Sequence, residues 1–141
     1  MAVRKAHAEW NGSLKEGKGS MKLGSGAFEG PFSFGTRFGD SPGTNPEELI
    51  GAAHAGCFSM AFSAMLGGAG YTPKSVKSTA DVHIDPVDGG FAITRIELSM
   101  KASIPDITNE EFQTIAEEAK ANCPVSRALA GTQITLNAEL I

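Results

Sequence analysis

Two cysteines, Cys57 and Cys123, are the residues of this chain most able to do chemistry. Cys57 lies in the apolar run GTNPEELIGAAHAGCFSMAF, where Ala and Gly precede it closely. A thiol becomes a good nucleophile only when it is deprotonated, and a nearby cation or a helix N-terminus favours that deprotonation. Because Cys57 falls well inside an expected helix, a cation from elsewhere would have to lower its pKa.

Arg37 is the best candidate for that cation. Its guanidinium is permanently charged and forked, so one edge can hold a carboxylate while the other faces a thiolate or a substrate oxygen. Glu47 or Glu48 could supply the carboxylate that orients it. The alternatives are that Arg37 is a solvated surface residue and that the two glutamates only compensate a helix dipole.

Cys123, in the run ANCPVSRAL, could take a second role in peroxide chemistry. A thiolate that attacks a peroxide becomes a sulfenic acid, which a nearby thiol can trap as a disulfide. An external dithiol could then reduce that disulfide. Because proline disfavours helical geometry in the residue before it, we expect Cys123 at a break before Pro124. Either cysteine could instead be an inert buried hydrophobic residue.

His54 supports a different hypothesis, since it lies three residues before Cys57 and shares its helix face. A Cys–His pair could act as an acyl-transfer nucleophile or begin a metal site. No third member is evident, because His7 and His83 fall on expected strands with nothing that marks them as ligands. We therefore expect no metal and no cofactor, and a buried, hydrogen-bonded His54.

The elements that must position these residues follow from the spacing of apolar side chains. Phe32, Phe34 and Phe38 recur at even spacing, which predicts a strand with Arg37 on its opposite face. A long helix is expected from Pro46 to about Gly67, with Thr44 or Asn45 as its cap. The other expected elements are strands near 3–10 and 15–23, a hairpin of 76–84 with 91–100, helices from 109 and over 124–129, and a strand over 134–140.

The order of strands, long helix, hairpin, helix and strand predicts a single α+β domain over residues 1–141. A change of parity between Ile93 and Ile96 indicates either a β-bulge or burial on both faces of that strand. The long helix is apolar around most of its circumference, so it must be covered on all sides. One small sheet cannot do this, and we expect a second copy of the chain to cover the rest.

The same helix limits which residues can share a site. Glu47 and Cys57 are ten residues apart, which is about 15 Å along a continuous helix. If both residues serve one site, either the helix breaks between them or Glu47 comes from the partner chain. The second case would make the dimer obligatory.

Composition excludes several classes of function. Of 141 residues, 41% are hydrophobic and 20% charged, and the net charge is -4 with no basic block, which argues against nucleic-acid binding. The N-terminal MAVRKAHAEW has no apolar core after it, and His54 and Ser59 interrupt the longest apolar run. We therefore expect neither a signal peptide nor a membrane span, and a cytoplasmic protein.

Three stretches of the chain resemble the OsmC/Ohr family of organic hydroperoxide peroxidases: GTNPEELIGAAHAGCFSMAF, VDGGFAITRIEL and AKANCPVSRAL. The resemblance implies an intertwined homodimer, with antiparallel sheets wrapped around long central helices and active sites at the interface. It implies that Cys57 is the peroxidatic cysteine, Cys123 the resolving cysteine, and Arg37 and Glu47 the activating pair. The implied activity is thiol-dependent reduction of organic hydroperoxides, in preference to hydrogen peroxide, with an external dithiol as reductant.

An apolar pocket would favour an alkyl hydroperoxide, and Phe34, Phe38, Phe58 and Met60 are candidates for its walls. The same residues could simply be core. The alternative function is therefore a non-catalytic dimeric binding protein that holds an apolar ligand in an interface pocket.

Overall fold

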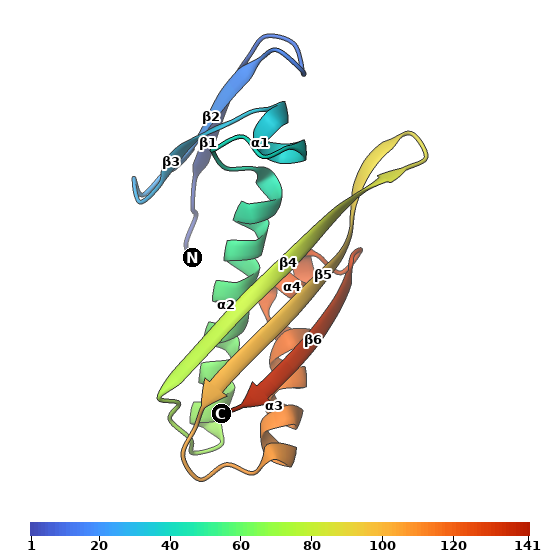
Figure 1. Cartoon of the computed structure of the whole chain (residues 1–141). Coiled ribbons are helices and arrows are strands. Elements are labelled where there is room, and N and C mark those ends of the chain that lie inside the picture. Colours follow the sequence, from blue (N-terminus) through green and yellow to red (C-terminus); the bar gives the residue numbers. More distant parts are fainter. The chain divides into compact units, whose positions relative to one another are not determined.

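The computed structural model describes residues 1–141, which form two compact units, residues 1–49 and residues 50–141. The prediction of a mixed α+β fold is confirmed, whereas the prediction of one domain over the whole chain stays a prediction. Figure 1 labels the elements in chain order: β1 (Ala6–Asn11), β2 (Lys18–Leu23), β3 (Glu29–Phe32), α1 (Phe34–Phe38), α2 (Pro46–Gly68), β4 (Ser75–Val87), β5 (Gly90–Ser103), α3 (Asn109–Asn122), α4 (Pro124–Ala128) and β6 (Gln133–Leu140).

The first unit contains a three-stranded antiparallel sheet in the order β1-β2-β3. The connection between β1 and β2, residues 12–17, begins at Gly12, which has a φ of 97°, a conformation that glycine adopts at no steric cost. Strands β1 and β2 each begin three residues later than the sequence predicts. The sheet is followed directly by α1.

The predicted strand through Phe34 and Phe38 is wrong, because these residues form the short helix α1. A spacing of four is compatible with one helix face as well as with one strand face. The capping box decides between them: Ser33 Oγ accepts from the Thr36 amide at 3.2 Å, and Thr36 Oγ1 accepts from the Ser33 amide at 2.8 Å. Arg37 therefore lies on a helix and not on a strand.

Asn45 fixes the start of α2 against α1. Its Oδ1 accepts a hydrogen bond from the Glu48 amide at 2.7 Å, and its Nδ2 donates to the Thr36 carbonyl at 3.2 Å. Asn45, and not Thr44, is thus the cap of α2, with Pro46 in the first helical position as expected. The same residue ties the first turn of α2 to the turn that carries Arg37.

The second unit contains a sheet in the order β4-β5-β6. The hairpin β4–β5 is antiparallel, and the register moves from His83↔Arg95 to Ile84↔Ile93, which leaves Thr94 as an extra residue. Of the two explanations for the parity change, the β-bulge is the correct one. The pair β5–β6 is parallel, because α3 and α4 form the crossover between these strands. The expectation of antiparallel sheets is therefore wrong for this pair of strands.

Figure 1 shows α2 and α3 on the same face of this sheet. Their contact includes an edge-to-face pair between Phe62 and Phe112, with ring centroids 5.6 Å apart. On the other side, α2 approaches β4 so closely that a Cβ on Gly51 would lie 3.2 Å from the Ala80 carbonyl. The buried core of the unit consists of Phe58, Phe62, Leu66, Ile96, Leu98, Met100, Ala102, Ile104, Phe112, Ile115, Ala116, Ala119 and Cys123.

One face of α2 is exposed in the single chain. The apolar composition of this helix predicts that all of its faces are covered, so the single chain does not provide the full cover. By length and composition alone α2 could also span a membrane, a test that core helices of soluble proteins pass as well. Met60 is 77% exposed on this face. The other exposed residues of the face are small: Ala52, Ala53, Gly56, Ser63, Ala64 and Gly67.

Helix α3 carries the chain to Cys123. Thr108 caps it by accepting from the Glu111 amide at 3.2 Å, while the Glu111 carboxylate accepts from Tyr71 Oη at 2.7 Å. Cys123 has a ψ of 126° and separates α3 from α4. The expected break before Pro124 is confirmed, and it places the thiol at the junction of two helices.

We expect Asn45→Ala to lower the free energy of unfolding by about 1 kcal/mol, because the Glu48 amide loses its cap. Urea unfolding of both proteins at one protein concentration measures this difference. Asn122→Ala is the control, since Asn122 is exposed and bonds only within α3; it should change stability by less than about 0.5 kcal/mol. Equal effects of the two substitutions would contradict the capping role.

Candidate active site

The two cysteines come together in the second unit. The Sγ atoms of Cys57 and Cys123 lie 2.8 Å apart, and both residues are free thiols. Cys57 is half-buried on α2, whereas Cys123 is fully buried at the α3–α4 junction. A disulfide could therefore form between them without a large movement of the backbone.

The two thiols differ in acidity. Burial raises the pKa of Cys57, and the hydrogen bond with Cys123 raises it further, while the Val125 backbone partly offsets both effects. Burial also raises the pKa of Cys123, but hydrogen bonds with Cys57 and Ser126 outweigh it, so the net pKa is lowered. Within residues 50–141 no cation offsets the effect of burial on the pKa of Cys57.

The first unit holds the predicted cation and its carboxylate together. Arg37 Nη2 donates to Glu47 Oε1 at 2.6 Å, and Arg37 Nε lies 3.2 Å from both carboxylate oxygens. The Glu47 side chain is only 8% exposed, whereas that of Arg37 is 37% exposed. Burial of the carboxylate and the forked contact fix one edge of the guanidinium. The edge that carries Nη1 makes no hydrogen bond.

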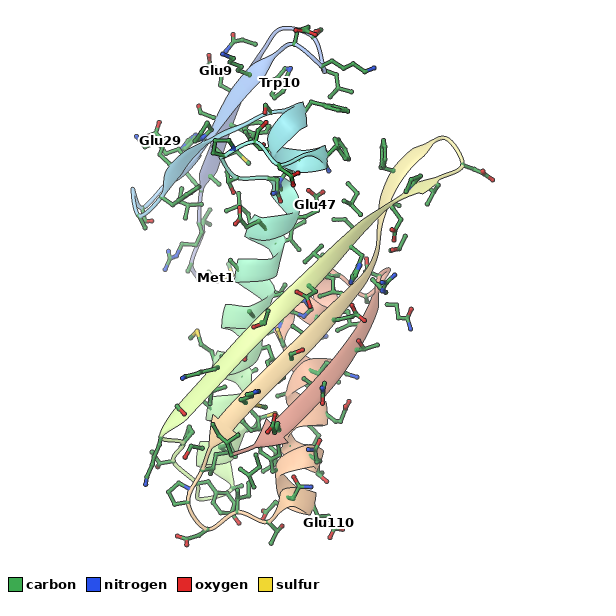
Figure 2. All side chains as sticks on the ribbon, in the orientation of Figure 1. Met1, Glu9, Trp10, Glu29, Glu47 and Glu110 are labelled. Carbon is green, nitrogen blue, oxygen red and sulfur yellow. The ribbon has the colours of Figure 1, made fainter.

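Glu48 does not share this role. Its carboxylate accepts a hydrogen bond from Thr44 Oγ1 at 2.9 Å, and the residue is exposed. The structure thus chooses Glu47 from the two glutamates that the sequence left open as the partner of Arg37. Figure 2 labels Glu47 in the first turn of α2.

An apolar pocket of about 250 Å³ lies next to Arg37 in the first unit. Two of the four predicted wall residues, Phe34 and Phe38, line it, whereas Phe58 is in the core of the second unit and Met60 is exposed on α2. The full lining is Trp10, Leu14, Phe32, Ser33, Phe34, Arg37, Phe38 and Pro46.

Sequence reasoning missed Trp10 and Leu14. Trp10 is the penultimate residue of β1, and its ring centroid lies 5.3 Å from that of Phe32. Leu14 lies in the β1–β2 connection. The sequence carries no spacing signal for either contact, because both depend on the register of the strands and on the path of a loop.

His54 does not pair with Cys57. Its Nε2 lies 2.7 Å from Ser126 Oγ, and its Nδ1 is buried without a hydrogen-bond partner. The hypothesis of an acyl-transfer Cys–His pair therefore has no geometry to support it. No group of three His, Cys, Asp or Glu side chains gathers closely enough to bind a metal ion.

Comparison with known proteins identifies the family of the chain. The sequence model of the family described as "OsmC-like protein" matches residues 38–139. The chain is 52% identical over 138 residues to peroxiredoxin OsmC of Escherichia coli (strain K12), covering 97% of this chain and 96% of that protein. It is 33% identical over 129 residues to the organic hydroperoxide resistance protein of Xanthomonas axonopodis pv. citri, covering 89% and 87%.

A solved structure supports the same assignment. The organic hydroperoxide resistance protein from Elizabethkingia anophelis superposes with a TM-score of 0.72 at 27% identity, covering 99% of each chain. The family match spans well over half of this chain, and the Escherichia coli relative is similar over nearly its full length. The chain therefore belongs to the OsmC-like protein family.

Proposed function

We propose that this protein is a thiol-dependent peroxidase that reduces organic hydroperoxides to alcohols. The observation that carries the proposal is the pair of free thiols 2.8 Å apart, one half-buried and one fully buried. The names of the relatives, peroxiredoxin and organic hydroperoxide resistance protein, support the same reaction. A non-catalytic binding protein would leave the two adjacent thiols without a role.

The reaction proceeds in three steps. The Cys57 thiolate attacks the terminal peroxide oxygen, the O–O bond breaks, and the alkoxide takes up a proton and leaves as the alcohol. Cys57 is now a sulfenic acid, and the Cys123 thiolate attacks its sulfur and displaces hydroxide to form the disulfide. An external dithiol then reduces this disulfide by thiol–disulfide exchange. These residues need no cofactor for any step.

Arg37 activates Cys57 in this mechanism, and Glu47 orients Arg37. Because burial raises the pKa of Cys57, its thiolate needs a cation that residues 50–141 do not supply. The edge of Arg37 that Glu47 does not occupy serves the thiolate and the leaving oxygen. The alkyl group of the substrate occupies the apolar pocket beside Arg37, a contact that hydrogen peroxide cannot make.

The active site is built by two chains. Helix α2 is continuous from Pro46 to Gly68, so Glu47 and Cys57 are about 15 Å apart along its axis. We therefore assign the Arg37–Glu47 pair of one subunit to Cys57 of the other. The exposed small-residue face of α2 forms the contact between subunits, since small side chains let helices approach closely. We place this homodimer in the cytoplasm, where dithiol reductants are available.

Single-turnover oxidation of the reduced protein tests the peroxidase. One equivalent of cumene hydroperoxide should consume two thiols and yield an intramolecular disulfide, measured by thiol titration and mass. Cys57→Ser should abolish this reaction, and Cys123→Ser should stop it at the sulfenic acid. Hydrogen peroxide should react more slowly, because it leaves the apolar pocket empty.

Two outcomes would contradict this proposal. Oxidation no faster than that of a free thiol in solution would exclude peroxidase catalysis. Equal rates with the organic hydroperoxide and hydrogen peroxide would exclude the role of the pocket.

We expect Glu47→Gln to slow sulfenic acid formation by about tenfold or more, because Arg37 loses a charge-assisted contact that fixes its geometry. Rapid mixing with cumene hydroperoxide in the Cys123→Ser background measures this step alone. Glu48→Gln is a matched control, because it removes the same charge from the same helical turn but leaves Arg37 bonded. An equal loss in both variants would indicate a general charge effect and no specific role for Glu47.

We expect Met60→Lys to dissociate the dimer, because it would bury an unpaired charge in the proposed contact between subunits. Light scattering measures the mass, and the hydroperoxide assay should show that activity falls with the dimer. Thr79→Lys is the control, since Thr79 is exposed on β4 and should leave mass and activity unchanged. A Met60→Lys protein that stays dimeric would place the interface elsewhere.

A further inference from the structure

Two buried polar side chains next to the thiol pair have no part in the mechanism above. His54 is fully buried on α2, and Ser126 is buried in α4, three residues after Cys123. Their side chains meet at 2.7 Å between His54 Nε2 and Ser126 Oγ. Cys123 is the N-cap of α4 and Ser126 lies in the first turn of that helix, where hydrogen bonds from its hydroxyl and its backbone lower the pKa of Cys123. The three residues form a chain of polar contacts that ends at the Cys123 sulfur.

The protonation of His54 decides what this chain can do. Burial lowers the pKa of His54, so the ring is neutral at neutral pH and carries one proton. The Nδ1 atom is buried without a partner. Orphaned N–H groups are rarer in protein interiors than orphaned acceptors, so the proton belongs on Nε2. In that tautomer Nε2–H donates to Ser126 Oγ.

The direction of this bond sets the direction of the next one. A hydroxyl has one proton, and Ser126 cannot donate it to both His54 and Cys123. Because Nε2 already donates to Oγ, the hydroxyl proton of Ser126 is available for the sulfur. A donor to sulfur favours the thiolate over the thiol.

We propose that His54 positions the Ser126 hydroxyl to donate to the Cys123 sulfur and so keeps Cys123 ready to attack the oxidised Cys57. The inference rests on the proposed peroxidase, in which Cys123 forms the disulfide. In that step the Cys123 thiolate gives two electrons to the sulfenic sulfur of Cys57, the S–S bond forms, and the S–O bond breaks. The leaving hydroxide takes up a proton equivalent to the one that Cys123 lost on ionisation, and it departs as water.

This assignment gives each thiol its own means of activation. Cys57 depends on a cation, Arg37, whereas Cys123 depends on a neutral donor, Ser126, that His54 orients. His54 is thus a positioning residue, because it reaches the sulfur only through Ser126.

Three substitutions test the proposal. Ser126→Ala removes the donor, and His54→Asn is too short to reach Ser126. His54→Gln places an amide N–H near the position of Nε2 and serves as the conservative rescue. After mixing with cumene hydroperoxide, Ser126→Ala and His54→Asn should form the disulfide about tenfold more slowly, which corresponds to about 1.4 kcal/mol. Sulfenic acid formation should be unchanged, and His54→Gln should behave as the wild type.

Two results would overturn the proposal. If His54→Gln slows disulfide formation as much as His54→Asn, the ring acts as a base or by packing and not as a donor. If Ser126→Ala and His54→Asn slow both steps equally, the contact only supports the fold.

A second measurement needs no peroxide. In the Cys57→Ser background, the ultraviolet absorbance of the remaining thiolate at neutral pH reports the ionisation of Cys123 directly. Ser126→Ala and His54→Asn should lower this absorbance, and His54→Gln should not. Unchanged absorbance in all three variants would refute the donor chain even if the protein is a peroxidase. If the absorbance follows the expected pattern but the protein with both cysteines does not consume hydroperoxide, the donor chain stands and the proposed peroxidase activity is refuted.

Discussion

The rigidity of α2 is the constraint on which the proposed active site depends. A continuous helix separates its residues by a fixed rise, so it cannot bend Glu47 back to Cys57. The guanidinium and its carboxylate are complete within residues 1–49, and the thiol pair is complete within residues 50–141. In the proposed mechanism the reaction needs both halves. A symmetric pair of chains would supply both halves twice and would also cover the exposed face of α2.

The ionisable groups of the two halves differ in whether a partner compensates for their burial. Glu47 can be buried as a carboxylate because Arg37 neutralises it with three short contacts. Cys57 has no such partner within its own unit, and burial therefore raises its pKa. In the proposed dimer, a guanidinium from the second chain would favour the reactive thiolate.

Much of this arrangement could be predicted from the sequence. The capped start of α2 and the break at Cys123 follow from local rules that involve neighbouring residues, whereas the bulge in β5 was one of two explanations that the sequence left open. The α1 helix could not be predicted, because the spacing of Phe34 and Phe38 fits a helix and a strand equally well. Only the Ser33–Thr36 bonds distinguish the two, and their presence cannot be read from residue types.

The sequence also could not identify which of Glu47 and Glu48 contacts Arg37. Both occupy the first turn of α2, but successive residues on a helix differ by about 100° in direction, so only one can face α1. The contact of His54 with Ser126 joins residues 72 apart and depends on how α2, α3 and α4 pack. No periodicity in one segment reports such a contact. The partner of Arg37 and the contact of His54 are therefore set by tertiary packing, which the sequence pattern does not report.

The long separation of the two thiols along the chain has a thermodynamic consequence. Cys57 and Cys123 are 66 residues apart, and the loop between them contains the β4–β5 hairpin and all of α3. In the chain-entropy account, a disulfide across a loop of this size removes about 4 kcal/mol of conformational freedom from the unfolded chain. The protein would therefore resist unfolding most while it awaits its reductant and least when it is ready for substrate.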